Sequence, residues 1–176
     1  IDITEQKQHN KMLETKIAVR TQALKESEQR YKLLASISPV GIFHLDLKGN
    51  CLYANQEFTE ITGLSAEEAY TEGGWEKTVH PEDIAKTKSA WFQTAKHNLP
   101  YKAEYRFLKP NGEINWVLAQ TAPVYNKDQQ VMSYVGTLTN ITERHLAEEK
   151  IRLQKQQLSR IERASAINEV ASSLAH

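Results

Sequence analysis

The chain has 176 residues, in which 22 Lys and Arg balance 22 Asp and Glu, so its formal net charge is zero. A neutral chain without a basic run argues against a nucleic acid as its partner. The single cysteine excludes an intramolecular disulfide bond, and no apolar run approaches the ~20 residues that a membrane span needs. We therefore expect a cytoplasmic protein without direct membrane contact, whose parent could still be anchored upstream.

Both ends of the chain predict a piece of a longer protein. The sequence opens without a leader or lipidation motif, and the last helical pattern reaches His176 with no capping signal. Composition divides the chain into a charged stretch over residues 5–36, a middle part over 37–140 that holds every Gly, Pro and Trp, and a second charged stretch.

The first charged stretch predicts a long helix with a narrow apolar seam. The seam repeats at alternating steps of three and four residues, if two polar positions are counted, through Leu13, Ile17, Arg20, Leu24, Ser27, Tyr31 and Leu34. A narrow seam with polar flanks favours a coiled coil that makes a homodimer, whereas a globular helix buries a wider stripe. The alternative is a charged helix that packs on its own domain.

The second charged stretch predicts another coiled-coil helix with a change of register. Apolar and seam positions follow heptad spacing through Ile151, Gln154, Leu158 and Ile161, then step by three through Ala164 and Ile167 before Ala171 and Leu174. An inserted step of three is a stammer, which locally overwinds a coiled coil. Packing on its own domain is again the alternative.

The middle part opens with two short strand patterns, over residues 41–46 and 51–54. The Gly49-Asn50 pair between them suits a tight hairpin turn. A short helix is then predicted over residues 56–61, and Gly63 is placed to end it.

Longer elements complete the middle part. Ser65-Ala-Glu-Glu68 predicts a capping box, and a helix is expected over residues 81–96 with Pro81 at its first position. Apolar residues alternate with charged ones over 101–107, as in a strand with one buried face, and two further strands are expected over 114–124 and 131–139. This order predicts an α+β domain, with a five-stranded antiparallel sheet and helices on one face.

A four-residue pattern occurs twice. Asp2-Ile-Thr-Glu5 returns as Asn140-Ile-Thr-Glu143, and both copies precede a charged helical pattern that Asp2 or Asn140 is placed to N-cap. The echo predicts that residues 1–36 leave a preceding module of the same kind, although a short capping motif can also recur by coincidence.

Several motifs of the middle part together resemble the PAS sensor fold over about residues 27–144. They are Asp46 with Gly49-Asn50 and Asn55, Ile61-Thr-Gly63, Trp75 with Val79-His-Pro-Glu-Asp83, Asn111-Gly112, and Gly136 with Asn140-Ile-Thr-Glu-Arg144. The resemblance implies a PAS domain over residues 37–140 and a signalling helix over 141–160. Asn140 stands where the family often has Asp, so its charge is missing at this joint.

The last residues, Ala171-Ser-Ser-Leu-Ala-His176, resemble the first half of the H-box of bacterial sensor histidine kinases. The resemblance implies that residues 161–176 begin a dimerisation helix and that His176 is the phosphoacceptor. A largely neutral imidazole can attack a phosphoryl group without a strong base. ATP would bind only in a kinase domain outside this chain, which alone would be no enzyme, and a response regulator would be the partner of the parent.

The same reading assigns signal relay to Asn140, Thr142 and Glu143, and a possible ligand pocket to the middle part. His44 interrupts an apolar strand, and it could line the pocket with Tyr53, Trp75, Trp91, Tyr105 and Trp116. Such residues bind a small polar or aromatic ligand, or simply fill a core that holds none.

No cofactor is named by the sequence. Haem-binding and flavin-binding members of the family use a histidine in the long helix or, in some cases, a reactive cysteine in a short helix. Here residues 82–96 contain no histidine, and Cys51 lies on a strand where a core role is expected. His80 precedes Pro81 as a structural cap, and the six histidines show no metal-ligand spacing.

Three rival functions remain open from the sequence. A PAS module can regulate another output, such as a diguanylate cyclase, through a similar helical exit. The chain could also be a structural dimerisation spacer without a ligand. A free-standing enzyme is the third, and it lacks a nucleophile–base pair, a phosphate-binding glycine loop and a metal cluster.

Overall fold

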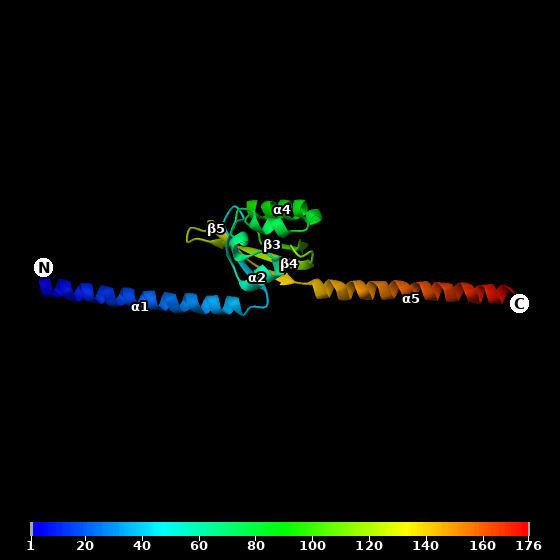
Figure 1. Cartoon of the computed structure of the whole chain (residues 1–176). Helices are drawn as coiled ribbons and strands as arrows, with labels where there is room; N and C mark the ends of the chain where they lie inside the picture. The colour runs from blue at the N-terminus through cyan, green and yellow to red at the C-terminus, as the bar shows by residue number, and fades with distance from the viewer. Residues whose placement is uncertain (1, 176) are drawn as a thin grey trace.

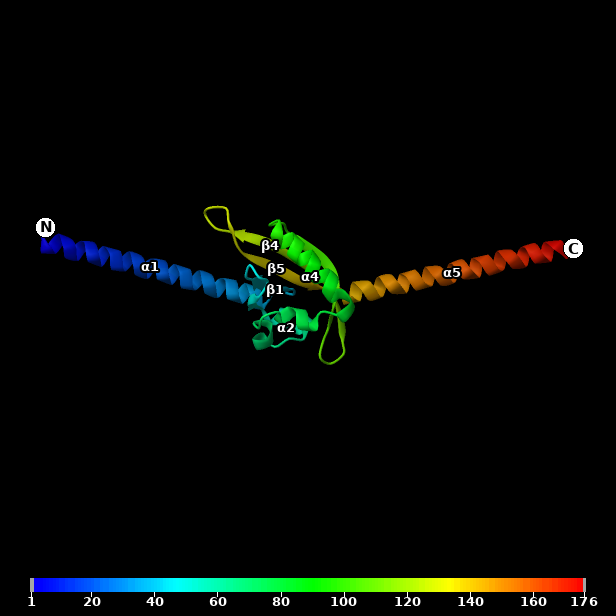
Figure 2. The same cartoon turned by 90° about the horizontal axis from the view of Figure 1, so that it is seen from above.

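Two long helices extend from opposite sides of a central domain in the computed structural model, which describes residues 2–175 (Figures 1 and 2). Helix α1 spans Ile3–Ser36 and helix α5 spans Thr142–Leu174. Neither helix has a buried residue within the described part of the chain. The prediction of two long flanking helices is confirmed. None of the described helices is both long and apolar enough to cross a lipid bilayer.

A five-stranded antiparallel sheet forms the centre of the domain, as predicted. Its strands are β1 (Gly41–Leu45), β2 (Cys51–Ala54), β3 (Tyr101–Leu108), β4 (Ile114–Tyr125) and β5 (Val131–Asn140). The strand order is β2-β1-β5-β4-β3. The last strand therefore lies in the middle of the sheet, between the first hairpin and the β3–β4 hairpin, and it leads directly into α5.

The remaining helices cover one face of the sheet, as Figures 1 and 2 show for α2 and α4. They are α2 (Gln56–Thr62), α3 (Ala66–Ala69), the 3-10 helix η1 (Gly74–Thr78) and α4 (Pro81–Lys96). Gly63 ends α2 with a φ of 74°, a conformation that costs glycine little. Ser65 and Glu68 form the predicted capping box, and the His80 side chain N-caps α4 with Pro81 in the first turn.

The hydrophobic core lies between this layer of helices and the inner face of the sheet. On β3 the side chains of Tyr101, Tyr105 and Phe107 are buried, whereas Lys102 and Glu104 are exposed. The period of two residues in a strand gives this alternation, as predicted. On the outer face of the sheet, a groove of about 730 Å³ lies between the end of α1 and the residues Ile42 and Tyr53.

Candidate functional site

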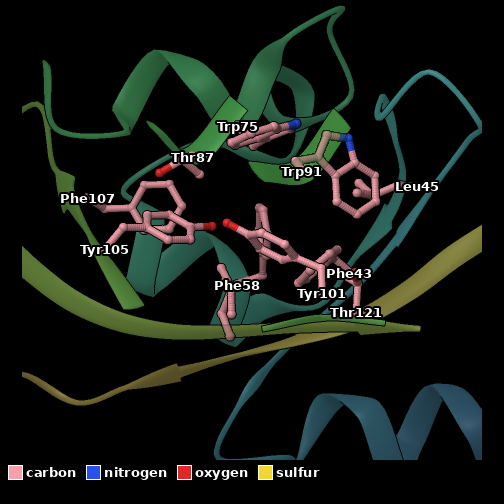
Figure 3. Close-up of a pocket in the computed structure, with 12 residues that line it drawn as sticks. Phe43, Leu45, Phe58, Trp75, Thr87, Trp91, Tyr101, Tyr105, Phe107 and Thr121 are labelled. Atoms are coloured by element: carbon pink, nitrogen blue, oxygen red, sulfur yellow. The ribbon is translucent and has the colours of Figure 1, made fainter. Parts of the chain in front are cut away.

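A small cavity lies in the core, between the inner face of the sheet and α2, η1 and α4 (Figure 3). Its volume is about 30 Å³. Its walls come from all these layers: Phe43, Leu45, Phe58, Trp75, Thr87, Trp91, Tyr101, Tyr105, Phe107, Ala119, Thr121 and Leu138. About one water molecule fits such a space, whereas a benzene-binding cavity in a protein measures about 150 Å³. A larger ligand requires the walls to move.

Three of the six residues expected at a pocket line this cavity. Trp75 reaches it from η1, Trp91 from α4 and Tyr105 from β3. The Trp91 indole is edge-on to Tyr101 and Tyr134, at centroid distances of 5.9 and 5.0 Å. The Trp75 indole Nε1 donates a 3.0 Å hydrogen bond to the carbonyl oxygen of Gly49.

The other three, His44, Tyr53 and Trp116, do not share the pocket, and the expectation that they would is wrong. Phe43 and Leu45 point inward from β1, so strand alternation turns His44 to the outer face. Tyr53 lines the groove beside α1. Trp116 precedes the inward-facing Val117 and so lies on the outer face as well.

Cavity residues that the sequence reading missed include Tyr101 and Phe107. Both stand on the same alternating face of β3 as Tyr105, so the period-two pattern contained the signal that could have found them. Phe58, Thr87 and Thr121 carried no comparable signal, because their place depends on how α2, α4 and β4 pack together.

Two hydroxyl groups in the cavity wall have no hydrogen-bond partner among the described residues. They belong to Tyr101 and Thr121, and both residues are 7% exposed. Burial raises the pKa of Tyr101 to about 12, and burial also raises the pKa of Tyr105. Both phenols are therefore protonated at neutral pH.

A second constellation joins the sheet to α5. The Ile141 amide donates to the carbonyl oxygen of Trp116 at 2.8 Å, and the Trp116 amide donates to the Thr142 hydroxyl at 2.9 Å. Asn140 Oδ1 accepts from the Thr142 amide at 3.0 Å and from its hydroxyl at 2.6 Å. Two of the three expected relay residues are thus tied to β4.

The helix start differs from the prediction that Asn140 is the N-cap. Asn140 still pairs with Val117 as the last residue of β5, so α5 begins one position later, with Ile141 at its N-cap. Asp2 accepts from the amide of Thr4, as Asn140 does from Thr142, so both copies of the repeated motif make the same bond over two residues. Glu143, the third expected relay residue, is exposed in the first turn of α5.

Side chains that the sequence reading missed hold the first turn of α5 against the outer face of the sheet. The His145 ring stacks on Trp116, and its Nε2 lies 3.2 Å from Glu104 Oε2. Arg144 donates to Glu104 Oε1 at 2.6 Å. The hydrogen bond from Arg144, and then that with His145, lower the pKa of Glu104. Trp116, expected in a pocket, belongs to this junction.

Asn55 makes the corresponding connection at the α1 end of the domain. Its Oδ1 accepts from the amides of Ile42 and Phe58, and its Nδ2 donates to the carbonyl oxygens of Ala35 and Val40. One buried amide thus links α1, β1 and α2, with both of its donors and its acceptor used.

The other candidate residues fall in three places. Cys51 is buried, and burial raises the pKa of its thiol to about 11, which disfavours a reactive thiolate. His80 caps α4, as expected. His176, the expected phosphoacceptor, lies outside the described residues. Over residues 2–175 no group of three His, Cys, Asp or Glu side chains could hold a metal ion.

These features define an α+β domain with an aromatic cavity and a helix leaving from its central strand. A family profile described as PAS fold matches residues 51–138, half of the chain. The chain therefore belongs to the PAS family, and its five-stranded sheet with helices on one face is the PAS fold.

Two relatives show the range of proteins that contain a similar segment. The chain is 32% identical over 146 residues to an uncharacterized protein, y4lL, of Sinorhizobium fredii. The alignment covers 83% of this chain and 18% of that protein. The chain is 26% identical over 151 residues to sporulation kinase C of Bacillus subtilis, in an alignment that covers 85% of this chain and 35% of the kinase. The chain spans at most 35% of the length of these curated relatives.

Solved structures agree on the fold. A sensory box histidine kinase/response regulator from Burkholderia thailandensis matches with a TM-score of 0.56 and 22% identity, over 74% of this chain and 98% of that one. The N-terminal domain of a diguanylate cyclase with a PAS/PAC sensor, from Marinobacter aquaeolei, matches with a TM-score of 0.56 and 17% identity, over 60% and 98%.

Proposed function

We propose that the chain is the sensing and transmitting region of a two-component sensor histidine kinase. In this proposal residues 1–36 are the helix that leads out of a preceding module, and residues 37–140 are the domain that senses the signal. Residues 141–160 transmit the signal, and residues 161–176 begin the dimerisation helix with His176 as phosphoacceptor. The observation that carries the proposal is the junction: the central strand β5 runs into α5, and Trp116 of β4 binds the first turn of that helix.

The two long helices support a homodimer. Apolar side chains along both are exposed in the described chain: Leu13, Ile17, Leu24, Tyr31 and Leu34 in α1, and Ile151, Leu158, Ile161, Ile167 and Leu174 in α5. Burying such a side chain contributes about 1.5–3 kcal/mol. A second copy that aligns the same seams would remove them from water and form coiled coils.

The direction of the signal follows from this arrangement. The cavity residues Trp75, Trp91 and Tyr105 are the proposed sensing surface, and a ligand shifts the domain between two states only by its different affinity for them. Any movement of β4 against β5 acts on α5 through Asn140 and Thr142, because their hydrogen bonds cross from one strand to the other. The stammer at Ala164 and Ile167 would then change how His176 is presented.

One of the two named relatives favours a kinase output, since the alignment with sporulation kinase C covers 85% of this chain at 26% identity. A kinase domain that binds ATP, and a response regulator, would then be the partners in the longer protein. The cytoplasm is the compartment where these partners and a free, buried Cys51 are expected.

An insertion series after Leu158 tests the proposal in the longer protein that carries this chain. Seven added residues keep the heptad register and should preserve regulated autophosphorylation, whereas three or four should lock it high or low. Changing His176→Gln should remove the phosphohistidine. Equal regulation after every insertion would contradict the relay.

A second candidate output is a nucleotide cyclase, which the similar fold of a cyclase sensor supports. Formation of a cyclic dinucleotide by the longer protein, with no phosphohistidine, would favour it. A purely structural spacer would instead show constant output when the cavity or the junction is altered.

A further inference from the structure

Two hydroxyl groups in the wall of the inner cavity, those of Tyr101 and Thr121, have no hydrogen-bond partner among the described residues. The Tyr101 side chain reaches in from β3, and its hydroxyl points toward that of Tyr105 across the open space (Figure 3). The Tyr101 hydroxyl has no hydrogen-bond partner among the described residues, although Tyr101 is only 7% exposed. Leaving a buried hydroxyl without a hydrogen bond costs free energy, so the site favours a ligand that supplies this hydrogen bond.

The other residues of the cavity wall define what kind of ligand fits. No residue among the described cavity lining carries a charge, and seven of the twelve are aromatic. An ion would lose its hydration there without a countercharge. Aromatic edges and faces favour a flat ring. An uncharged ring with one hydrogen-bonding group therefore matches this lining.

Entry requires one wall to move, because the closed cavity measures about 30 Å³. Trp75 and Trp91 also line an outer hollow of about 250 Å³, together with Lys48, Glu72 and Lys88 among others. Trp91 of α4 is buried, and its indole is fixed between the rings of Tyr101 and Tyr134. Trp75 is only partly buried, and it lies on the short η1 helix. The two indoles thus form a partition between the cavity and the outer hollow, and Trp75 is the part of this partition that can move.

We propose that the cavity binds a small uncharged phenol, which passes the Trp75 indole and exchanges a hydrogen bond with the Tyr101 hydroxyl. This inference rests on the proposed sensing function and names the chemistry of its ligand. In the closed state the hydrogen bond from Trp75 Nε1 to the Gly49 carbonyl oxygen holds the partition in place.

Binding of 4-fluorophenol to the full chain, followed by fluorine NMR, tests the proposal. Fluorobenzene, which lacks the hydroxyl, and 4-fluorobenzoate, which is charged, are the matched probes. We expect saturable binding of 4-fluorophenol, at least tenfold weaker binding of fluorobenzene, and none of the benzoate. Tyr101→Phe should weaken 4-fluorophenol at least fivefold and leave fluorobenzene unchanged, which also reports an intact cavity. Tyr53→Phe, whose hydroxyl lies outside the cavity, should change neither.

Trp75→Phe tests the route, since it removes the indole hydrogen bond and shortens the partition. The association rate of 4-fluorophenol should rise at least threefold, and an unchanged rate would overturn the entry route. Absence of saturable binding, or equal affinity in Tyr101→Phe, would overturn the ligand assignment. Those results leave the insertion series after Leu158 unaffected, whereas a failed insertion series with intact binding would reject the relay alone.

Discussion

The imidazole of His145 stacks on the indole of Trp116, with ring centroids 4.1 Å apart and ring planes inclined by 16°. The pair joins the first turn of α5 to β4, from the face of the sheet opposite the cavity. Arg106 lies over the same indole, with its guanidinium carbon 5.4 Å from the centroid, while its own guanidinium binds Asp83 of α4. Contacts therefore run from α4 through β3 and β4 to the exit helix.

Replacing His145 by alanine should loosen the start of α5. The stacked pair contributes about 1 kcal/mol, so amide exchange over residues 142–146 should accelerate about fivefold. Hydrogen–deuterium exchange measures this, with His9→Ala on the exposed face of α1 as the control. Unchanged protection in the first turn of α5 would show that the hydrogen bonds of Thr142 hold the joint alone.

Asn140→Asp should strengthen the same joint. The side chain accepts two hydrogen bonds at the start of α5, and a carboxylate there gains about 0.3–1 kcal/mol from the helix dipole. Urea unfolding reports the change. Asn126→Asp is the control, because Asn126 accepts two backbone hydrogen bonds in a turn that precedes no helix. A gain of the same size in both variants would exclude the helix dipole as its cause.

Asn55→Ala should be among the more damaging changes to the domain. It removes four hydrogen bonds around a buried residue, and we expect a loss of roughly 3 kcal/mol or more in the free energy of unfolding. Asn111→Ala, in the exposed β3–β4 turn, should cost less than about 1 kcal/mol. Equal losses in thermal or chemical unfolding would contradict the linking role of Asn55.

Acid should weaken the link between α4 and β3. Hydrogen bonds from Arg106 hold the pKa of Asp83 below its ordinary value of 3.8. Because the folded pKa is the lower one, the stabilisation is complete above the unfolded pKa and disappears as pH falls through the folded value. Asp83→Asn should cost about 1–3 kcal/mol at pH 7. Unfolding measured from pH 7 to pH 2 should show the difference from the unaltered chain shrinking below pH 3.8, and a constant difference would contradict this assignment.

Gly136 tests how closely the sheet packs around the cavity. A Cβ there would lie 2.5 Å from both the Gln120 carbonyl oxygen and Phe43 Cζ, so Gly136→Ala should cost roughly 3 kcal/mol. Gly112→Ala is the matched control, since its φ of +85° adds strain but a Cβ would meet nothing within 4 Å. That control should lose about 1–2 kcal/mol. A smaller loss at Gly136 than at Gly112 would show that β5 can shift.

Local signals in the sequence were sufficient for most of the elements. The Pro81 and Gly63 helix boundaries and the alternation along β3 are set by the backbone and by strand geometry, which depend on near neighbours. The strand order, with β5 between β1 and β4, depends on contacts far apart in sequence and was not predicted.

The site was harder to predict for the same reason. Aromatic character alone does not say which face of a strand a residue occupies, and so Trp116 was assigned to the cavity although it lies on the outer face. Its partner His145 carried no signal, because the stack forms only when the first turn of α5 lies beside β4. Tyr101 was within reach of the pattern, but its orphan hydroxyl required the packed core.

A native mass spectrum of the purified chain tests the central claim most directly, because a relay through paired helices requires two copies. A homodimer predicts ions at twice the chain mass of 20.1 kDa. It also predicts that Leu24→Glu combined with Leu158→Glu, both on exposed seams, shifts them to the single mass. A monomer for the unaltered chain at micromolar concentration would contradict the account.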